Sequence, residues 1–206
     1  MGDAQLLAAW RDGDLTAGGA LFERYYAAVV RFFGNKVSGD PADLIQETFE
    51  ACTRSRDHVR DDNGFRSFLF GVAYNVLRRH YERTRRRDER VDPTTASVAE
   101  LSPGPATMVA SRDEHRLLLT ALRRIPLEFQ VILELFYWES MTSAAIAESL
   151  DMPHGTVRSR LRRARQLVEE ALRELGDDPG LTARTLENLE GWAAQIRQAQ
   201  GGLSNS

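Results

Sequence analysis

Apolar residues recur along this chain at three- and four-residue steps, and this spacing constrains its fold more than any other feature. Early examples are Leu6, Leu7, Trp10, Leu21, Phe22, Tyr25, Val29, Phe32 and Phe33. Such steps place side chains on one face of an α-helix. No stretch alternates apolar and polar residues, as a half-buried strand would. The pattern therefore predicts an all-α protein.

Breaks in the pattern separate the expected helices. Proline suits the first turn of a helix, so a helix is expected from Ala42, directly after Pro41. The turn formers at residues 61–64 end that region, and another helix is expected from Phe65. Further helices are expected over residues 115–124 and 127–138, followed by a tight pair over 142–175.

The composition changes between residues 89 and 111, which contain prolines, serines and threonines but no aromatic residue. A flexible linker is expected there. It would join two small helical domains, at residues 1–88 and 112–175, of which the second ends in a helix-turn-helix. Residues 176–206 form a C-terminal extension after a Gly/Asp/Pro break. Two alternatives remain for this extension: a short helix with a disordered end, or a tail that is disordered throughout.

Composition excludes several classes of protein. A chain of 206 residues with 42% hydrophobic content can build packed cores. Cys52 is the single cysteine, which predicts a reducing, cytoplasmic location. Neither a secretory signal nor a membrane-spanning run of apolar residues is recognisable. No metal-ligand spacing, nucleophilic arrangement or phosphate loop is present, so we expect no metal, cofactor or catalysis.

The stretch "HGTVRSRLRRARQLVEE" begins at His154 and concentrates positive charge in a chain whose formal net charge is -3. On an ideal helix, apolar residues share one face and polar residues the opposite face. The apolar face holds Val157, Leu161, Ala164, Val168 and Ala171, and the polar face holds Arg158, Ser159, Arg162, Arg163 and Gln166. A solvated helix normally interleaves acids with its arginines. The unbroken basic face predicts contact with nucleic acid.

A short helical segment with Ile146, Ala147 and Leu150 directed inward precedes this arginine-rich helix. A break at residues 151–153 separates the two. Two helices joined by a short turn, with donors on the second, are typical of a helix-turn-helix. The second helix of such a pair enters the major groove, where Arg can bond two acceptors of guanine. We therefore expect contact with duplex DNA.

The helix expected from Phe65 ends in a second basic cluster. Its arginines are Arg78, Arg79, Arg83, Arg85, Arg86 and Arg87, and aromatic residues such as Phe68 and Tyr74 interleave with this segment. Rings can stack on released bases while arginines follow the backbone, which predicts single-stranded or opened DNA. Simple capping of the helix dipole is the alternative. The helix from Ala42 instead carries acids on one side, and the residues alone favour an ordinary exposed face over a protein-binding surface.

Three stretches together resemble the extracytoplasmic-function class of bacterial sigma factors. "DPADLIQETFEAC" resembles that family's D-L-x-Q-E-x-F helix, and "FRSFLFGVAYNVLRRHYERTRRR" resembles its W-L-x-x-I-A-x-N segment with a basic tail. "MTSAAIAESLDMPHGTVRSRLRRARQLVEEAL" resembles its terminal G-T-V-x-S-R-L-x-R-A-R helix. The order of the stretches also agrees, and the resemblance covers roughly residues 5 to 175.

The resemblance implies a cytoplasmic, non-enzymatic subunit that directs core RNA polymerase to promoter DNA. The residues that would bind polymerase are Asp43, Leu44, Gln46, Glu47 and Phe49. The residues that would read and hold open the minus-ten element are Asp62, Asn63, Phe68, Asn75, Arg78 and Arg79. The residues that would read the minus-thirty-five element as duplex are His154, Thr156, Arg158, Ser159, Arg162 and Arg163. An anti-sigma protein is a further candidate partner.

The sequence departs from the family pattern at several positions. Phe68 stands where Trp is usual. Arg79 and Glu82 stand where the family often has Asp and Arg, so the two charges are exchanged. Ala145 replaces a Glu, which removes a capping box from the helix that begins after Thr142. Two other hypotheses stay open. One is a stand-alone helix-turn-helix regulator that needs no polymerase, and the other is a helical adaptor that binds only proteins.

Overall fold

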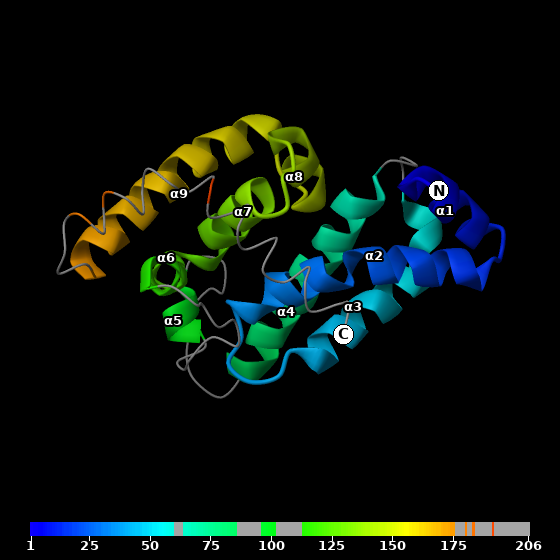
Figure 1. Ribbon diagram of the computed structural model, residues 1–206, viewed down its shortest axis with the longest axis horizontal. Coiled ribbons are helices and arrows are strands. Elements are labelled where there is room, and N and C mark those ends of the chain that lie inside the picture. The colour runs from blue at the N-terminus through cyan, green and yellow to red at the C-terminus, as the bar shows by residue number, and fades with distance from the viewer. Residues whose placement is uncertain are drawn as a thin grey trace.

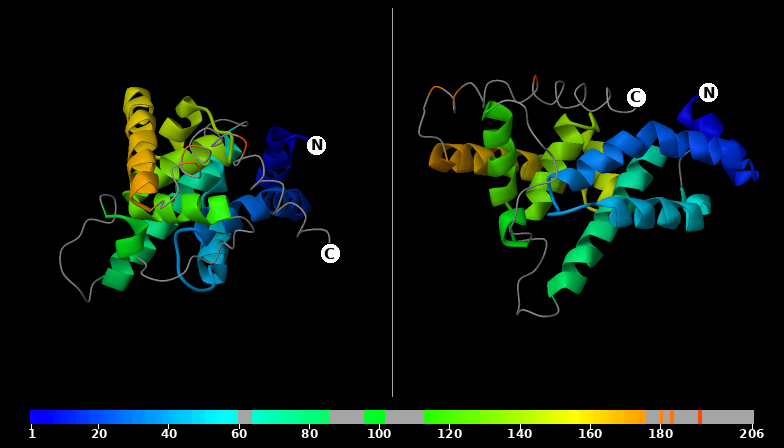
Figure 2. Two further views of the ribbon diagram at one scale, coloured as in Figure 1. Left: turned by 60° about the vertical axis from the view of Figure 1, so that its left-hand side comes forward. Right: turned by 60° about the horizontal axis from the view of Figure 1, so that its bottom comes forward.

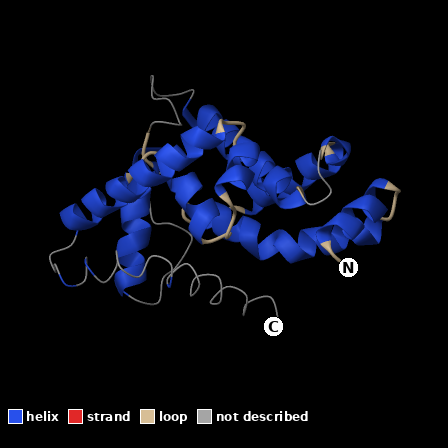
Figure 3. Ribbon diagram, turned by 90° about the horizontal axis from the view of Figure 1, so that it is seen from above, coloured by secondary structure: helices blue, strands red, loops and turns tan. Residues whose placement is uncertain are grey.

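The computed structural model describes residues 1–59, 64–85, 96–101 and 113–175, together with Gly180, Ala183 and Gly191. Figure 1 draws the remaining residues as a thin grey trace. Every regular element within the described ranges is a helix, and these ranges contain no strand (Figure 3). The all-α prediction is confirmed. No described helix has the length and apolar character needed to cross a membrane.

The first domain consists of α1 (Asp3–Arg11), α2 (Leu15–Gly34), α3 (Ala42–Arg54), the 3-10 helix η1 (Arg56–His58) and α4 (Phe65–Arg85). Asp14 caps α2, because its side chain accepts hydrogen bonds from the N–H groups of Thr16 and Ala17. Such a cap stabilises a helix by about 1 kcal/mol. Both α3 and α4 begin where the sequence predicted. They pack against each other, and α1 lies against α2.

The second domain consists of α6 (Asp113–Arg124), α7 (Leu127–Tyr137), α8 (Ser143–Ser149) and α9 (His154–Leu175), close to the expected bounds. The long helix α9 contacts α6, α7 and α8 (Figure 1). Thr142 caps α8 by accepting a hydrogen bond of 3.1 Å from the N–H of Ala145. The cap therefore forms without the glutamate that would complete a capping box.

Part of the expected linker is ordered. Within residues 89–111 the helix α5 (Val98–Leu101) forms, and its Val98 and Leu101 are buried together with the preceding Ala96. The carbonyl of Ala96 accepts a hydrogen bond of 2.9 Å from the N–H of Leu127. At these positions the structure differs from a flexible linker, because apolar side chains reach the core beside α6 and α7. Residues 86–95 and 102–112, and nearly all of the extension at 176–206, lie outside the described residues.

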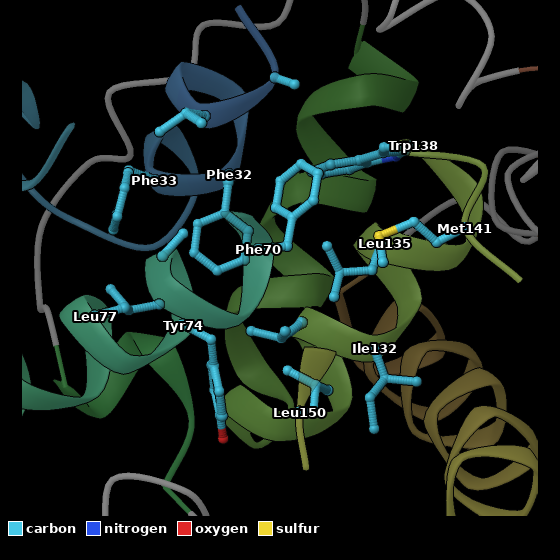
Figure 4. Packing of buried hydrophobic residues seen from close by; sticks show 14 of the residues in the cluster. Phe32, Phe33, Phe70, Tyr74, Leu77, Ile132, Leu135, Trp138, Met141 and Leu150 are labelled. Carbon is cyan, nitrogen blue, oxygen red and sulfur yellow. The ribbon is translucent and has the colours of Figure 1, made fainter. Parts of the chain in front are cut away.

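The two domains pack directly against each other. Figure 2 shows the second domain alongside the first from two further sides, and α4 contacts α8. Figure 4 shows buried residues from both domains in one place, with Phe70 and Tyr74 of α4 on one side and Leu135 and Leu150 on the other. One continuous apolar cluster thus spans both domains. The sequence suggested two domains connected only by a linker, whereas in the structure they are also in direct contact.

Cys52 is buried in this core, and burial raises the pKa of its thiol to about 12. Thiol reagents attack the thiolate, and an unfolded cysteine titrates near pH 8.5. We expect the native chain to react with a disulfide reagent at pH 8 at least about 100-fold more slowly than the chain in denaturant. An Arg54→Cys variant provides the control, since that exposed position should react at once. Rapid reaction of native Cys52 would contradict its burial.

Candidate nucleic-acid interface

The predicted faces of the arginine-rich helix are confirmed for α9. Val157, Leu161, Ala164 and Val168 are buried. The residues on the opposite side, Arg158, Ser159, Arg162, Arg163 and Gln166, are exposed. A groove of about 570 Å³ lies beside this exposed face, and Arg158, Arg162, Arg165 and Phe136 are among the residues that line it. The second domain therefore presents a concave, basic surface.

The turn between α8 and α9 orients this surface. Asp151 has a φ of 50°, which is a left-handed conformation that reverses the chain after α8. Pro153 then precedes the first residue of α9, His154, whose Nε2 lies 2.7 Å from the hydroxyl oxygen of Ser143. This contact joins the start of α9 to the start of α8. His154 is exposed and Thr156 is partly exposed at the positively polarised end of the helix.

The arginines of α9 differ in whether they already have partners. Arg160 pairs with Glu128 of α7, and Arg163 pairs with Glu170 at 3.2 Å. Arg165 lies over the ring of Tyr137, 5.3 Å from its centroid. By contrast, neither Arg158 nor Arg162 has a hydrogen-bond or ion-pair partner within the described part of the chain. These two side chains are the most available donors on the helix. The sequence alone did not distinguish them from their neighbours.

The candidate residues of the first domain lie along α4. Phe68 is partly exposed, and Asn75 and Arg79 are exposed. On an ideal helix these three positions fall within about 40° of one another, so they share one side. Arg78 lies beside this side, where it covers the ring of Tyr74 at 5.9 Å. Asp62 and Asn63, also expected at this site, lie outside the described residues.

The acidic side of α3 adjoins the basic part of α4, which the sequence did not predict. The carboxylate of Glu47 lies 3.3 Å from Arg79 and 3.4 Å from Arg83. No local pattern links these residues, because more than thirty positions of sequence separate them. The pKa of the nearby His80 is lowered by burial and by Arg83, while Glu47 acts in the opposite direction. A candidate polymerase-binding residue is thus in contact with a candidate DNA-binding residue.

The remaining candidate residues of α3 divide between surface and core. Asp43 and Gln46 are exposed. Phe49 is partly buried, and its ring lies 4.6 Å from that of Phe22 between centroids. Leu44 is only 8% exposed and faces the core. Leu44 can therefore position this surface but offers little of its own area to a partner.

The chemistry of these surfaces is that of binding. They contain arginines, amide and hydroxyl groups, aromatic rings and exposed acids. No group of His, Cys, Asp or Glu side chains within the described ranges could hold a metal ion. A basic concave face and a separate aromatic and basic helix suit two different forms of nucleic acid.

Comparison with known families assigns both domains. Residues 21–87 match the family described as Sigma-70 region 2, and residues 115–168 match Sigma-70, region 4. The first range contains most of α2 and all of α3 and α4. The second range begins within α6 and ends within α9, so it includes the helix-turn-helix.

Curated relatives match most of the chain. It is 29% identical over 182 residues to the ECF RNA polymerase sigma-E factor of Salmonella typhimurium, covering 84% of this chain and 95% of that protein. The factor of the same name from Escherichia coli K12 matches with the same figures. The one from Haemophilus influenzae is 27% identical over 182 residues.

The fold is similar to that of a solved structure, CnrH in complex with the cytosolic domain of CnrY. The TM-score is 0.60 at 20% sequence identity, and the match covers 84% of this chain and 99% of the other. This likeness concerns the fold alone. The two matched regions and the curated relatives lead to one assignment: the chain belongs to the extracytoplasmic-function family of RNA polymerase sigma factors, which are DNA-binding transcription initiation factors.

Proposed function

We propose that this sigma factor binds core RNA polymerase and directs it to promoters through two separate DNA surfaces. In this proposal α9 reads the minus-thirty-five element as duplex, and α4 with the residues directly before it holds the minus-ten element open. The observation that carries the proposal is that Arg158 and Arg162 are exposed on the outward face of the helix-turn-helix and have no partner among the described residues. The role of the chain is to bind and position, not to catalyse.

Duplex reading by α9 follows from its shape and its donors. An α-helix fits the major groove, where a guanidinium can bond both O6 and N7 of guanine. Arg158 and Arg162 supply these groups, and Ser159 lies beside them on the exposed face. His154 and Thr156, near the start of the helix, suit phosphate contacts because helix N-termini attract anions. Arg163 would have to leave Glu170 to contact DNA.

Binding of opened DNA by α4 follows from the side shared by Phe68, Asn75 and Arg79. An aromatic ring stacks on any unpaired base, while an amide can bond a base edge and arginines follow the backbone. Arg78 and Arg79 would supply the charge. Asp62 and Asn63, which precede α4 in the sequence and lie outside the described residues, complete the proposed minus-ten site.

Polymerase binding is proposed for the exposed side of α3, with Asp43, Gln46 and Glu47 as polar contacts and Phe49 as the apolar one. The net charge of -3 repels phosphates, so the chain alone should bind promoters weakly. Attachment to polymerase would raise the effective concentration of DNA at both surfaces. The contact of Glu47 with Arg79 and Arg83 supports this arrangement, because it brings the side of α3 that we propose for docking next to the side of α4 that we propose for the minus-ten element.

Protein partners and location follow from the same reasoning. CnrH has been solved in complex with the cytosolic domain of CnrY. By this likeness we extend to the present chain the expectation that an anti-sigma protein binds it. Its work on polymerase and promoter DNA would take place in the cytoplasm.

The test of duplex reading starts from promoters selected from random DNA by polymerase carrying this factor. The double variant Arg158→Ala, Arg162→Ala should reduce initiation at these promoters by about 30-fold or more, because each lost base contact costs about 1–3 kcal/mol. The matched control is Arg54→Ala, Arg173→Ala, which removes the same charge from two exposed sites elsewhere. Initiation by the first double variant at the native rate would contradict the proposal.

A further inference from the structure

The last two residues of α1 contact both ends of the segment that joins η1 to α4. Arg11 ends α1, and its guanidinium donates hydrogen bonds to the carbonyl oxygen of Arg56, at 3.5 Å, and to that of Val59. The ring of Trp10 lies 6.3 Å from that of Phe65, the first residue of α4, between centroids. One turn of a helix more than forty positions away therefore contacts the chain where it leaves η1 and where it enters α4.

The ring of Trp10 has a specific place beside Phe65. Its side chain is buried, and it packs edge-on against the ring of Phe22 at 5.2 Å between centroids. The guanidinium of Arg56 lies 5.7 Å from its centre. Gly18 of α2 leaves room for this ring, because a Cβ atom at Gly18 would lie 2.4 Å from Nε1 of Trp10.

Both contacts of α1 lead to the proposed minus-ten surface. Phe65 is fully buried, and its ring lies 6.3 Å from that of Phe68. Phe68 is partly exposed and is the aromatic residue that would stack on an opened base. Val59 is buried and is the last described residue before the candidates Asp62 and Asn63. The two contacts therefore flank the residues proposed to bind this element.

The side chain of Arg11 is suited to fixing backbone. It is only partly buried, so it contributes little to the core. A guanidinium presents its donors in a rigid planar fork, which can serve two carbonyl oxygens at once. Holding both ends of a short segment also reduces the conformational entropy that the segment loses when it binds.

We propose that Arg11 and Trp10 are positioning residues for the minus-ten element. They fix Val59 and the start of α4, so that the proposed site meets the opened bases in one geometry. This proposal rests on the proposed function of α4. A loosely held site would still attract DNA through Arg78 and Arg79, but it would discriminate less between bases. The contacts of α1 thus act on specificity more than on affinity.

Arg11→Ala tests the backbone contacts, and Arg24→Ala is its matched control. Arg24 also ties α2 to α1, through Asp3 and the carbonyl oxygen of Met1 near the opposite end of that helix. Both variants lose one positive charge. Only the first loses the hydrogen bonds to the carbonyls of η1 and Val59.

A second pair of variants acts on the ring of Trp10. Gly18→Ala should displace this ring, because the added methyl group would overlap it. A Cβ atom at the neighbouring Gly19 would meet nothing within 4 Å, so Gly19→Ala is the control for replacing glycine in this helix. Circular dichroism and urea unfolding establish that each variant is folded.

The first measurement is initiation by polymerase carrying each factor, on promoters in which every base of the minus-ten element is changed in turn. Each change should lower initiation by the native factor on the order of tenfold. Arg11→Ala should reduce this discrimination at least about threefold, and Gly18→Ala should act in the same direction. The response to changes in the minus-thirty-five element and the dependence of DNA affinity on salt should stay native, because a positioning residue neutralises no phosphate. Both controls should discriminate as the native factor does.

The second measurement uses the free chain, without polymerase or DNA. In the first turn of α4 the N–H of Phe68 donates a hydrogen bond of 2.9 Å to the carbonyl oxygen of Gly64. Arg11→Ala and Gly18→Ala should speed hydrogen exchange at this amide at least about fivefold, and the controls should leave it unchanged.

Three results would overturn the proposal. The first is a folded Arg11→Ala variant with native discrimination at the minus-ten element, and the second is native hydrogen exchange at Phe68 in that variant. The third is an equal loss of affinity for all sequences with a smaller salt dependence, which would make Arg11 a phosphate contact. Failure of the proposed function is separable. A native factor without base preference at the minus-ten element would remove the role of α4, whereas exchange in the free chain would still decide whether α1 holds this segment.

Discussion

The double variant Asp43→Arg, Glu47→Arg should lose binding to core RNA polymerase, with a rise in Kd on the order of 100-fold or more. These acids lie on the side of α3 proposed to dock on polymerase, where Asp43 is exposed and Glu47 is partly exposed. Reversed charges would face a surface that complements acids, and like charges across an interface cost several kcal/mol. Co-elution with core polymerase on a sizing column, followed by a titration, measures the loss.

Two controls make this result specific. Glu148→Arg, Glu174→Arg makes the same charge change on exposed residues of the second domain and should bind polymerase as the native chain does. Asp43→Arg alone leaves the contacts of Glu47 with Arg79 and Arg83 intact, so it separates polymerase docking from effects on the minus-ten surface. If the native chain fails to co-elute but holds specific duplex DNA, the protein is a free-standing regulator.

Replacing Lys36 by methionine should lower the free energy of unfolding by about 3–5 kcal/mol, which is the usual cost of breaking a buried ion pair. Lys36, the only lysine of the chain, is fully buried against Glu134. Burial lowers the pKa of Lys36 and raises that of Glu134, while each charge favours ionisation of the other. Without Lys36, the carboxylate of Glu134 would remain buried with only neutral partners such as Gln130.

The double variant Lys36→Met, Glu134→Gln should recover at least half of this loss, because it leaves no buried charge and the new amide can still bond Gln130. Urea unfolding followed by circular dichroism, with Cys52 reactivity as a second probe, measures both variants. Arg173→Met breaks an exposed ion pair with Glu169 and should change stability by less than about 1 kcal/mol. A similarly small effect for Lys36→Met would show that the pair of Lys36 and Glu134 contributes little to the free energy of unfolding.

Much of the local structure could be predicted from the sequence. The starts of α3 and α4, the helix-turn-helix and the buried face of α9 follow from periodicity, turn residues and caps, which act over a few positions. The residues of the candidate DNA surfaces could also be named, because an unbroken basic face on a helix is visible in the sequence itself and the resemblance to the family implies the others. Their roles on promoter DNA remain predictions.

The sequence could not predict which of those residues are already paired with other side chains and which are available to contact DNA. Arg160 is paired with Glu128 and Glu47 with Arg79 and Arg83, whereas Arg158 and Arg162 have no partner within the described ranges. The partners of Arg160 and Glu47 come from other helices, and periodicity along one helix carries no information about its neighbours. The same limit explains why the ordered α5 and its contact with Leu127 were missed.

The sequence by itself determined most of the helices and their order, the two domains and the family to which the chain belongs. Only the tertiary structure decided that the domains pack together, through pairs such as Arg31 with Glu139, which are 108 positions apart, and Lys36 with Glu134, which are 98 apart. The physical reason is the distance along the sequence over which each kind of contact acts. Helix formation depends on residues within about one or two turns, whereas contact between domains depends on two finished surfaces whose shapes and charges exist only after each domain has folded.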